Sequence, residues 1–147
     1  MSYQDKLAHL RDFDRLGAAV GDLAEELAEP ARVIGSGVTP LEIVAALRSL
    51  PQSRWAWVLR QAADLSLANV PALAGRTLVL VDRTGLMAGP AWPGAPLTRA
   101  DAAAAFGAAI AARASSADLV QFGTAVARVP VRPRESPLRV VERFALS

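Results

Sequence analysis

The sequence of 147 residues lacks cysteine altogether and has a single histidine, His9. The absence of cysteine excludes disulfide bonds, thiolate metal sites and cysteine nucleophiles. His9 lies in a charged segment with no serine or acid arranged around it as a triad, so we expect a solvated histidine. No other set of residues combines a nucleophile, a base and an oxyanion donor. The sequence therefore predicts a protein that is not an enzyme.

Long apolar runs are also missing. No stretch reaches the roughly 20 consecutive apolar residues of a membrane span. The first residues, MSYQDKLAHLRDFD, are charged and lack the apolar core of a signal peptide. We therefore expect a cytoplasmic protein with no membrane partner, and the lack of cysteine is compatible with that compartment.

Aromatic residues make up only 5% of the chain, whereas hydrophobic residues as a whole reach 52%. Alanine supplies much of this apolar content, which indicates a helix-rich core of small side chains. The net charge is only +2, although arginine greatly outnumbers lysine. This balance permits an anionic partner without requiring one.

The first half of the chain carries the signals of short helices separated by turns. Apolar residues recur at helical spacing in SYQDKLAHLRDF. Pro30 should break or restart the next helix. Thr39 and Glu42 form a capping box with a proline between them, and Ser53 can cap a further helix. Helices joined by short proline-marked turns are typical of an α-solenoid or a helical hairpin.

The second half changes character and predicts a small sheet. TLVLVD at 77–82 is a continuous apolar strand of the kind that is covered on both faces in a parallel sheet. A capping box at Thr98 then opens an alanine-rich helix that extends to about residue 114. A second strand at 117–123 and an antiparallel third strand at 124–131 follow. An amphipathic helix over 136–147 completes this half.

Asp82 ends the apolar strand, and Thr84 follows two residues later. Ligands of open parallel sheets bind outside the carboxyl ends of the strands. A carboxylate and a hydroxyl are oxygen ligands that suit Mg²⁺. The alternative is that Asp82 caps the following loop through hydrogen bonds to backbone N–H groups.

The spacing Asp-x-Thr-Gly-x-Met resembles the metal-ion-dependent adhesion site of von Willebrand factor A domains, Asp-x-Ser-x-Ser. That pattern places the aspartate and the two hydroxyls at Asp82, Thr84 and Leu86. A leucine cannot bind a cation, so Leu86 breaks the motif. The resemblance therefore implies at most a weak Mg²⁺ site at Asp82 and Thr84, and indicates that the metal has been lost.

The stretch from LRSLPQSRWAWVLRQ to RTGLM resembles the junction region of bacterial TROVE proteins, the family of the Ro autoantigen. LRDFDRLG near the start and ADLVQFGTAVARVPV near the end fit the same family. The resemblance covers the chain from about Leu10 onward. Members of this family bind small noncoding RNA of the Y type and misfolded RNA through a ring of helical repeats, and they are not enzymes.

The resemblance implies an α/β fold in two parts. The first, 1–73, is a helical (HEAT-like) segment from the end of the TROVE helical module. The second, 74–147, is a partial, Rossmann-like von Willebrand A unit with a three-stranded sheet. A full ring and a complete A domain need more residues, so the resemblance implies a truncated or degenerate ribonucleoprotein component.

Arg48, Arg54 and Arg60 are the candidate RNA contacts. Arginine pairs well with phosphate, and a cluster would make binding depend on salt. The alternative is a solvated face on which these arginines pair with Asp64 or Glu42.

Trp55 and Trp57 are about 200° apart on a helix, so they cannot both face its core. We expect the second tryptophan to pack on the adjacent domain, with stacking on a base or a partner as the alternative.

A sheet of three strands leaves an exposed edge and apolar surface. This predicts self-association or a protein partner that completes the sheet. Three functions therefore stay open: an RNA-binding remnant of the TROVE class, a structural fragment that self-associates, and an adhesion-type module that binds a protein carboxylate through a cation. The sequence does not name an RNA.

Overall fold

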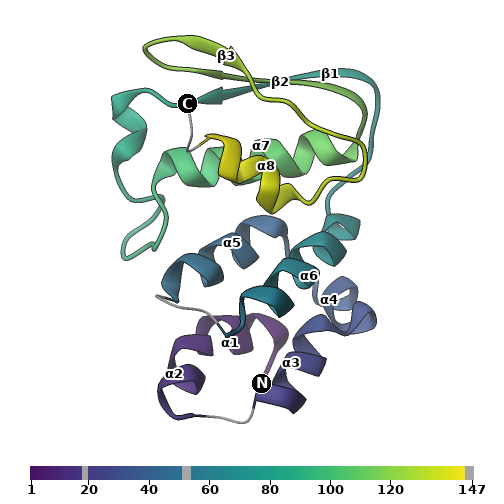
Figure 1. The fold of residues 1–147 in the computed structure, drawn as a ribbon, viewed down its shortest axis with the longest axis vertical. Coiled ribbons are helices and arrows are strands. Elements are labelled where there is room, and N and C mark those ends of the chain that lie inside the picture. The colour runs from purple at the N-terminus through teal and green to yellow at the C-terminus, as the bar shows by residue number, and fades with distance from the viewer. Residues whose placement is uncertain (18–19, 51–53, 145–147) are drawn as a thin grey trace. The chain divides into compact units, whose positions relative to one another are not determined.

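The computed structural model describes residues 1–17, 20–50 and 54–144 (Figure 1). The chain divides into two compact units, Met1–Asn69 and Val70–Ser147. The assignment of domains to 1–73 and 74–147 stays a prediction, because compactness alone does not show that either unit folds independently.

The described elements of the first unit are all helical, and those of the second unit combine helices with a sheet. The first unit contains α1 (Tyr3–Ala8), α2 (Leu10–Arg15), α3 (Val20–Ala28), α4 (Pro30–Ser36), α5 (Pro40–Ser49), α6 (Ala56–Ser66) and the 3-10 helix η1 (Leu67–Asn69). The second contains β1 (Leu73–Asp82), the 3-10 helix η2 (Gly85–Ala88), α7 (Arg99–Arg113), β2 (Ala114–Phe122), β3 (Val126–Arg128) and α8 (Pro137–Phe144). Within the described ranges, no helix is both long enough and apolar enough to cross a membrane. The predicted α/β class, helical first and with a three-stranded sheet after it, is confirmed.

In the first unit, the predicted helix boundaries at Pro30 and Thr39 are found in the structure. Helix α3 ends two residues before Pro30, which starts α4. The backbone N–H and the hydroxyl of Thr39 both donate hydrogen bonds of 2.8 Å to the carboxylate of Glu42, so the capping box at the start of α5 is confirmed. Ser53, the predicted cap of the next helix, lies outside the described residues.

The core of the first unit forms around α6, which packs against α3, α4 and α5. The largest fully buried side chains in the core of this unit are Trp55, Leu10, Leu27, Ile43, Leu59, Val33, Val38 and Val58. Tyr3 reaches into this core and donates a hydrogen bond of 2.8 Å from its hydroxyl to the carbonyl of Leu27. Burial raises the pKa of Tyr3 to about 12 because it disfavours the charged phenolate.

The sheet of the second unit has the strand order β1-β2-β3. Strands β1 and β2 are parallel and are connected through α7, whereas β2 and β3 are antiparallel. The third strand is shorter than the predicted range 124–131. After Arg128, only the N–H of Val129 still donates to the sheet, to the carbonyl of Leu119 at 2.8 Å. Pro130 follows and has no N–H to continue the ladder.

Helix α7 lies against one face of the sheet, and α8 packs beside α7 (Figure 1). The close approach of α7 depends on Gly107. A Cβ atom at this position would lie 2.7 Å from Cγ2 of Val81 and 3.4 Å from Cγ1 of Val79. Val81 and Leu119 are buried on this face, with 2% and 1% of their surface exposed.

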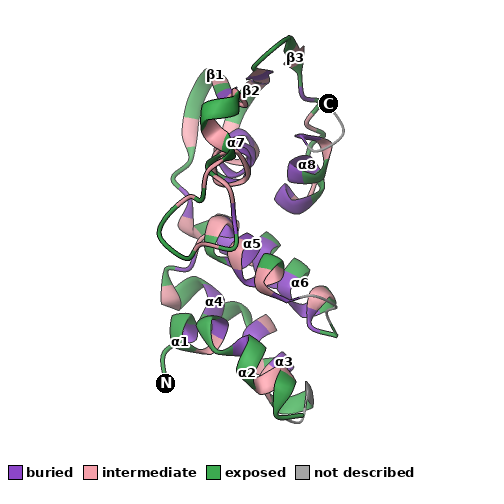
Figure 2. Cartoon of the chain, turned by 90° about the vertical axis from the view of Figure 1, so that its left-hand side faces the viewer, coloured by how far each residue is buried: buried purple, intermediate pink, exposed green. Residues whose placement is uncertain are grey.

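The other face of the sheet differs from the prediction that β1 is covered on both sides. Leu78 and Leu80 remain 62% and 60% exposed. Figure 2 shows exposed residues along β1. The physical reason is that the helices described in this unit gather on the face of Val79 and Val81. Side chains alternate along a strand, so Leu78 and Leu80 point to the opposite side.

Candidate functional sites

Arg54, one of the predicted RNA contacts, is engaged within the first unit. Its Nε donates a hydrogen bond of 2.7 Å to Oδ1 of Asp14, and its guanidinium lies 5.3 Å from the ring centre of Trp55. The indole Nε1 of Trp55 donates to the same Asp14 oxygen at 3.1 Å. The partner of Arg54 is therefore neither Asp64 nor Glu42. The sequence carried no local signal for this pair, because its members lie 40 positions apart.

Arg48 and Arg60 are both exposed. Arg48 lies in the last turn of α5 and Arg60 near the middle of α6, and these two helices pack against each other. Arg54 precedes the first residue of α6. The structure therefore places the three arginines on the α5–α6 hairpin of one compact unit, and their contact with RNA stays a prediction.

The two tryptophans have opposite environments. Trp55 is fully buried, whereas Trp57 is 57% exposed. Trp57 and Arg60 are three residues apart on α6, so they are neighbours on the same face of the helix. An exposed indole beside a guanidinium is a surface on which an unpaired base can stack while its phosphate meets the cation. Arg54 and Arg60, which the sequence suggested as RNA contacts, are six positions apart. Trp57 and Arg60 are only three positions apart, and this shorter spacing puts their side chains on the same face of α6.

Charge is unevenly distributed over the two units. The first holds seven basic and nine acidic side chains, and the second holds nine basic and five acidic ones. Acidic side chains gather on α3 and just before α4, where Asp22, Glu25, Glu26, Glu29 and Arg32 line a shallow hollow. A hydrogen bond from Lys6 lowers the pKa of Glu26 and keeps that carboxylate charged. Any phosphate contact on the first unit is therefore confined to a local cluster rather than a broad basic face.

The candidate metal loop begins at Asp82, the last residue of β1. Oδ1 of Asp82 accepts a hydrogen bond of 2.8 Å from the backbone N–H of Thr84, which is the loop-capping contact considered as the alternative to a metal. Thr84 then precedes η2, where Leu86 is 84% exposed. The guanidinium of Arg83 donates to the carbonyls of Ala100 and Phe144 and so ties the loop to α7 and α8.

Asp82 and Thr84 do not by themselves fit a Mg²⁺ site. Mg²⁺ requires near-octahedral oxygen coordination, and this loop offers one carboxylate and one hydroxyl. Among the described residues, no group of three or more His, Cys, Asp or Glu side chains comes together that could hold a metal ion. At the motif position of the second hydroxyl the chain has Leu86, whose hydrocarbon side chain supplies no oxygen. A weak Mg²⁺ site stays a prediction.

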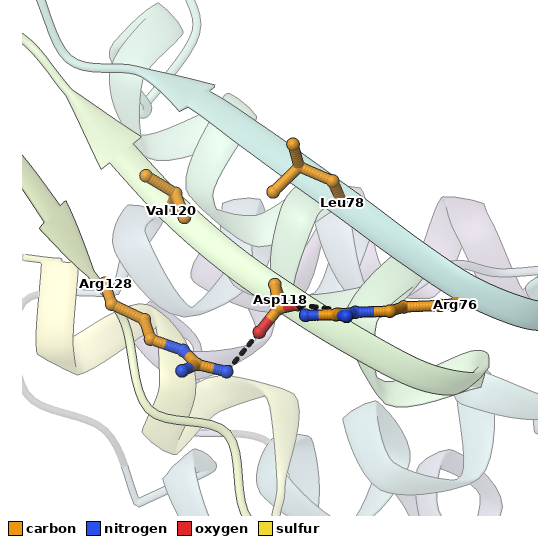
Figure 3. A pocket seen from close by; sticks show the side chains of 5 residues that line it. All are labelled: Arg76, Leu78, Asp118, Val120 and Arg128. Carbon is orange, nitrogen blue, oxygen red and sulfur yellow. Dashed lines mark hydrogen bonds and ion pairs between the residues drawn. The ribbon is translucent and has the colours of Figure 1, made fainter.

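Sequence reasoning missed a charged cluster on the exposed face of the sheet. Asp118 on β2 accepts hydrogen bonds from Arg76 on β1, at 2.8 and 3.1 Å, and from Arg128 on β3 (Figure 3). The hydrogen bond from Arg76 is the main reason that the pKa of Asp118 is lowered. The register that aligns these strands depends on their pairing in the sheet, so residue spacing along the chain did not reveal the cluster.

No known protein-family model matches the sequence, and no curated protein sequence matches it. Among solved structures, the chain is similar to the crystal structure of the Deinococcus radiodurans RO (RSR) protein, with a TM-score of 0.73 and 24% sequence identity. The match covers 97% of this chain and 33% of that protein, so the chain spans about a third of the length of its structural neighbour. At this identity the likeness shows a shared fold. The relation to Ro proteins that the sequence motifs indicated is thereby supported at the level of the fold.

Proposed function

We propose that this chain binds RNA, as a module of the Ro type, through the hairpin of α5 and α6. The observation that carries the proposal is that exposed Trp57 and exposed Arg60 lie three residues apart on α6, the spacing of neighbours on one helix face. Stacking of a base on an aromatic side chain contributes roughly 1–3 kcal/mol, and it does not require a particular base. The fold shared with the RO protein supports the proposal but does not identify an RNA.

The other two arginines take different parts in this proposal. Arg48, exposed in the last turn of α5, adds a second phosphate contact on the same hairpin. Arg54 has a side chain that is 38% exposed and is paired with Asp14. It contributes positive charge to the surface while it positions the start of α6. Replacing Arg54 would disturb both roles, so Arg60 is the cleaner residue to test.

The charge pattern limits the strength of the proposed contact. The acidic side chains of α3 and of Glu29 repel phosphate, so only the hairpin is expected to touch RNA. For two or three phosphate contacts, log K should fall with log salt with a slope of about −1.4 to −2.1, since single-stranded nucleic acid gives about −0.7 for each contact. We therefore expect modest affinity and a preference for single-stranded loops, in which bases are free to stack.

The loop at Asp82 has a structural role in this proposal. Its aspartate caps the loop through the N–H of Thr84, and no catalytic step is assigned to it. The proposed function is binding without catalysis, in the reducing cytoplasm with which a cysteine-free chain is compatible.

The test is fluorescence anisotropy with a labelled RNA hairpin that has a single-stranded loop. Trp57→Leu should weaken binding at least fivefold, because it keeps an apolar side chain but removes the stacking surface. Trp57→Phe should retain most of the affinity. Arg60→Ala should weaken binding and make the salt slope shallower by about 0.7. Arg139→Ala, which removes an exposed arginine of α8, is the matched control and should have no effect.

Two results would overturn the proposal. One is a folded wild-type chain that does not bind the hairpin even at low salt. The other is equal loss of binding in Arg60→Ala and Arg139→Ala, which would show that general positive charge rather than the α6 surface is responsible.

A further inference from the structure

One face of the sheet carries apolar and charged side chains without a covering layer among the described residues. We call it the open face and define it by Arg76, Leu78, Leu80, Asp118, Val120 and Arg128. Leu78 and Leu80 are 62% and 60% exposed on this face, whereas Val81 on the opposite face is 2% exposed (Figure 2). The difference follows from strand alternation, with α7 packed on the side of Val81.

Exposed leucines at alternate positions are unusual for a parallel pair of strands. Parallel sheets occur almost only with helices on both faces, and their strands are apolar on both sides for that reason. The run Leu78–Val81 has this character, and β1 and β2 are parallel through its whole length. The composition of β1 therefore suits a second helical layer.

The open face also has a definite shape and charge. Arg76, Leu78, Asp118, Val120 and Arg128 line a shallow hollow of about 570 Å³ (Figure 3). Leu78 and Val120 provide its apolar part, and the three charged residues lie along one side. Asp118 is shared by two arginines whose side chains are 80% and 72% exposed, so one positive charge is in excess at this rim.

We propose that the open face binds an amphipathic α-helix of a partner protein. The helix would place leucine-type side chains on Leu78, Leu80 and Val120, and an aspartate or glutamate opposite Arg76 and Arg128. A helix is the element that covers a parallel sheet, and an acidic residue complements the excess positive charge of Arg76 and Arg128.

The same observations disfavour two other occupants. A second copy of the chain would bring another excess of positive charge to the interface, because it carries the same two arginines and one aspartate. RNA would leave Leu78 and Leu80 against polar groups. The inference concerns the second unit and does not rest on the proposed RNA binding of the first.

The test uses a labelled synthetic peptide of about 18 residues, five helical turns long, with leucines on one side and glutamates at their border. The first control is a peptide of identical composition whose leucines are spread around the helix. The second replaces every glutamate by lysine. We expect the acidic amphipathic peptide to bind at least tenfold more tightly than either control, as measured by fluorescence anisotropy.

Variants of the protein locate the site. Leu80→Gln should weaken binding of the acidic peptide at least tenfold, whereas Phe106→Gln should not. Phe106 is the matched control because it is 61% exposed on α7, outside the open face. The double variant Arg76→Glu with Arg128→Glu should prefer the lysine peptide, a reversal that misfolding cannot produce. Circular dichroism of each variant checks that it is folded.

Three outcomes would overturn the proposal. The first is equal binding of the amphipathic peptide and its rearranged control. The second is binding that Leu80→Gln and Phe106→Gln weaken alike. The third is a dimer in sedimentation velocity that Leu80→Gln converts to a monomer, together with no peptide binding, which would make a second copy the occupant of the open face.

Discussion

Oδ1 of Asp14 accepts a hydrogen bond of 2.7 Å from Nε of Arg54, although 40 positions separate the two residues. The same oxygen accepts a hydrogen bond of 3.1 Å from the indole of Trp55, which is fully buried. The carboxylate of Asp14, near the end of α2, thus binds Arg54 and Trp55, the two residues that directly precede α6. An arginine that the sequence suggested as an RNA contact also stabilises the first unit.

Asp14→Ala should destabilise the chain, because it leaves the buried indole N–H of Trp55 and the guanidinium of Arg54 without this acceptor. Loss of a hydrogen-bond partner for a buried group costs about 1–3 kcal/mol. The measurement is the free energy of unfolding in urea. Asp12→Ala, an exposed aspartate on the same helix, is the control and should change stability by less than about 0.5 kcal/mol. Equal effects of the two substitutions would contradict the assigned role of Asp14.

Gly107→Ala should also destabilise the chain, even though alanine favours helices by up to about 1 kcal/mol over glycine. The new Cβ would lie 2.7 Å from Cγ2 of Val81, a stiff side chain with only 2% of its surface exposed. Overpacking of this kind costs about 1–3 kcal/mol. Thermal unfolding measures the effect.

Adding Val81→Ala to Gly107→Ala provides the matched test of this clash. The shorter side chain removes the atom that the new Cβ meets, so the double variant should lose less stability than the two single variants together. Strict additivity would show that the cost of Gly107→Ala arises elsewhere.

Leu86→Ser should strengthen Mg²⁺ binding, because it adds a third oxygen near Asp82 and Thr84 at the position where the motif has leucine. Leu86 is 84% exposed, so the substitution should leave stability nearly unchanged. Titration calorimetry with MgCl2 should give little or no heat for the wild type and measurable binding for the variant. Asp82→Ala in the Leu86→Ser background should abolish that binding. A wild-type chain that binds Mg²⁺ as tightly as the variant would show that our assignment of Leu86 is wrong.

Acid should weaken the attachment of α8 through Glu135. The hydrogen bond from Arg143 lowers the pKa of Glu135, whose side chain is only 8% exposed. Since the folded-state pKa is depressed, the stabilisation is present above the ordinary glutamate pKa of about 4.3 and is lost as pH falls through the folded-state value.

Glu135→Gln should therefore lower the urea midpoint at pH 7 and reduce the further fall of that midpoint below pH 4. Glu25→Gln, which changes an exposed glutamate of α3, is the control and should keep the wild-type pH dependence. An unchanged pH profile in Glu135→Gln would assign the acid sensitivity to other carboxylates.

The local features of the fold were predictable because their causes lie within a few residues. The capping box of Thr39 and Glu42 needs only a three-residue spacing, and Pro30 starts a helix because its ring cannot continue the one before it. The strand predicted at 77–82 follows from an apolar run that ends at Asp82, and β1 (Leu73–Asp82) contains it. The order of helix and strand along the chain likewise predicted the parallel pairing of β1 and β2.

The candidate sites were less predictable, because each depends on residues that are distant in sequence. The two possible roles of Asp82 were visible in the sequence, but the hydrogen bond to Thr84 required the actual path of the loop. The choice between Trp55 and Trp57 as the buried tryptophan also required the packing of α6 against its neighbours.

By itself, the sequence determined the helical first half, the helices and strands of the second half and the broken metal motif at Leu86, since helix caps, apolar runs and motif spacing are all local in the chain. Only the tertiary structure decided that Asp14 is the partner of Arg54 and that Asp118 joins Arg76 and Arg128. It also decided that Leu78 and Leu80 lie on the open face. The reason is physical: the packing of α7 selects which side of an apolar strand is buried, and strand register brings charges from three strands together.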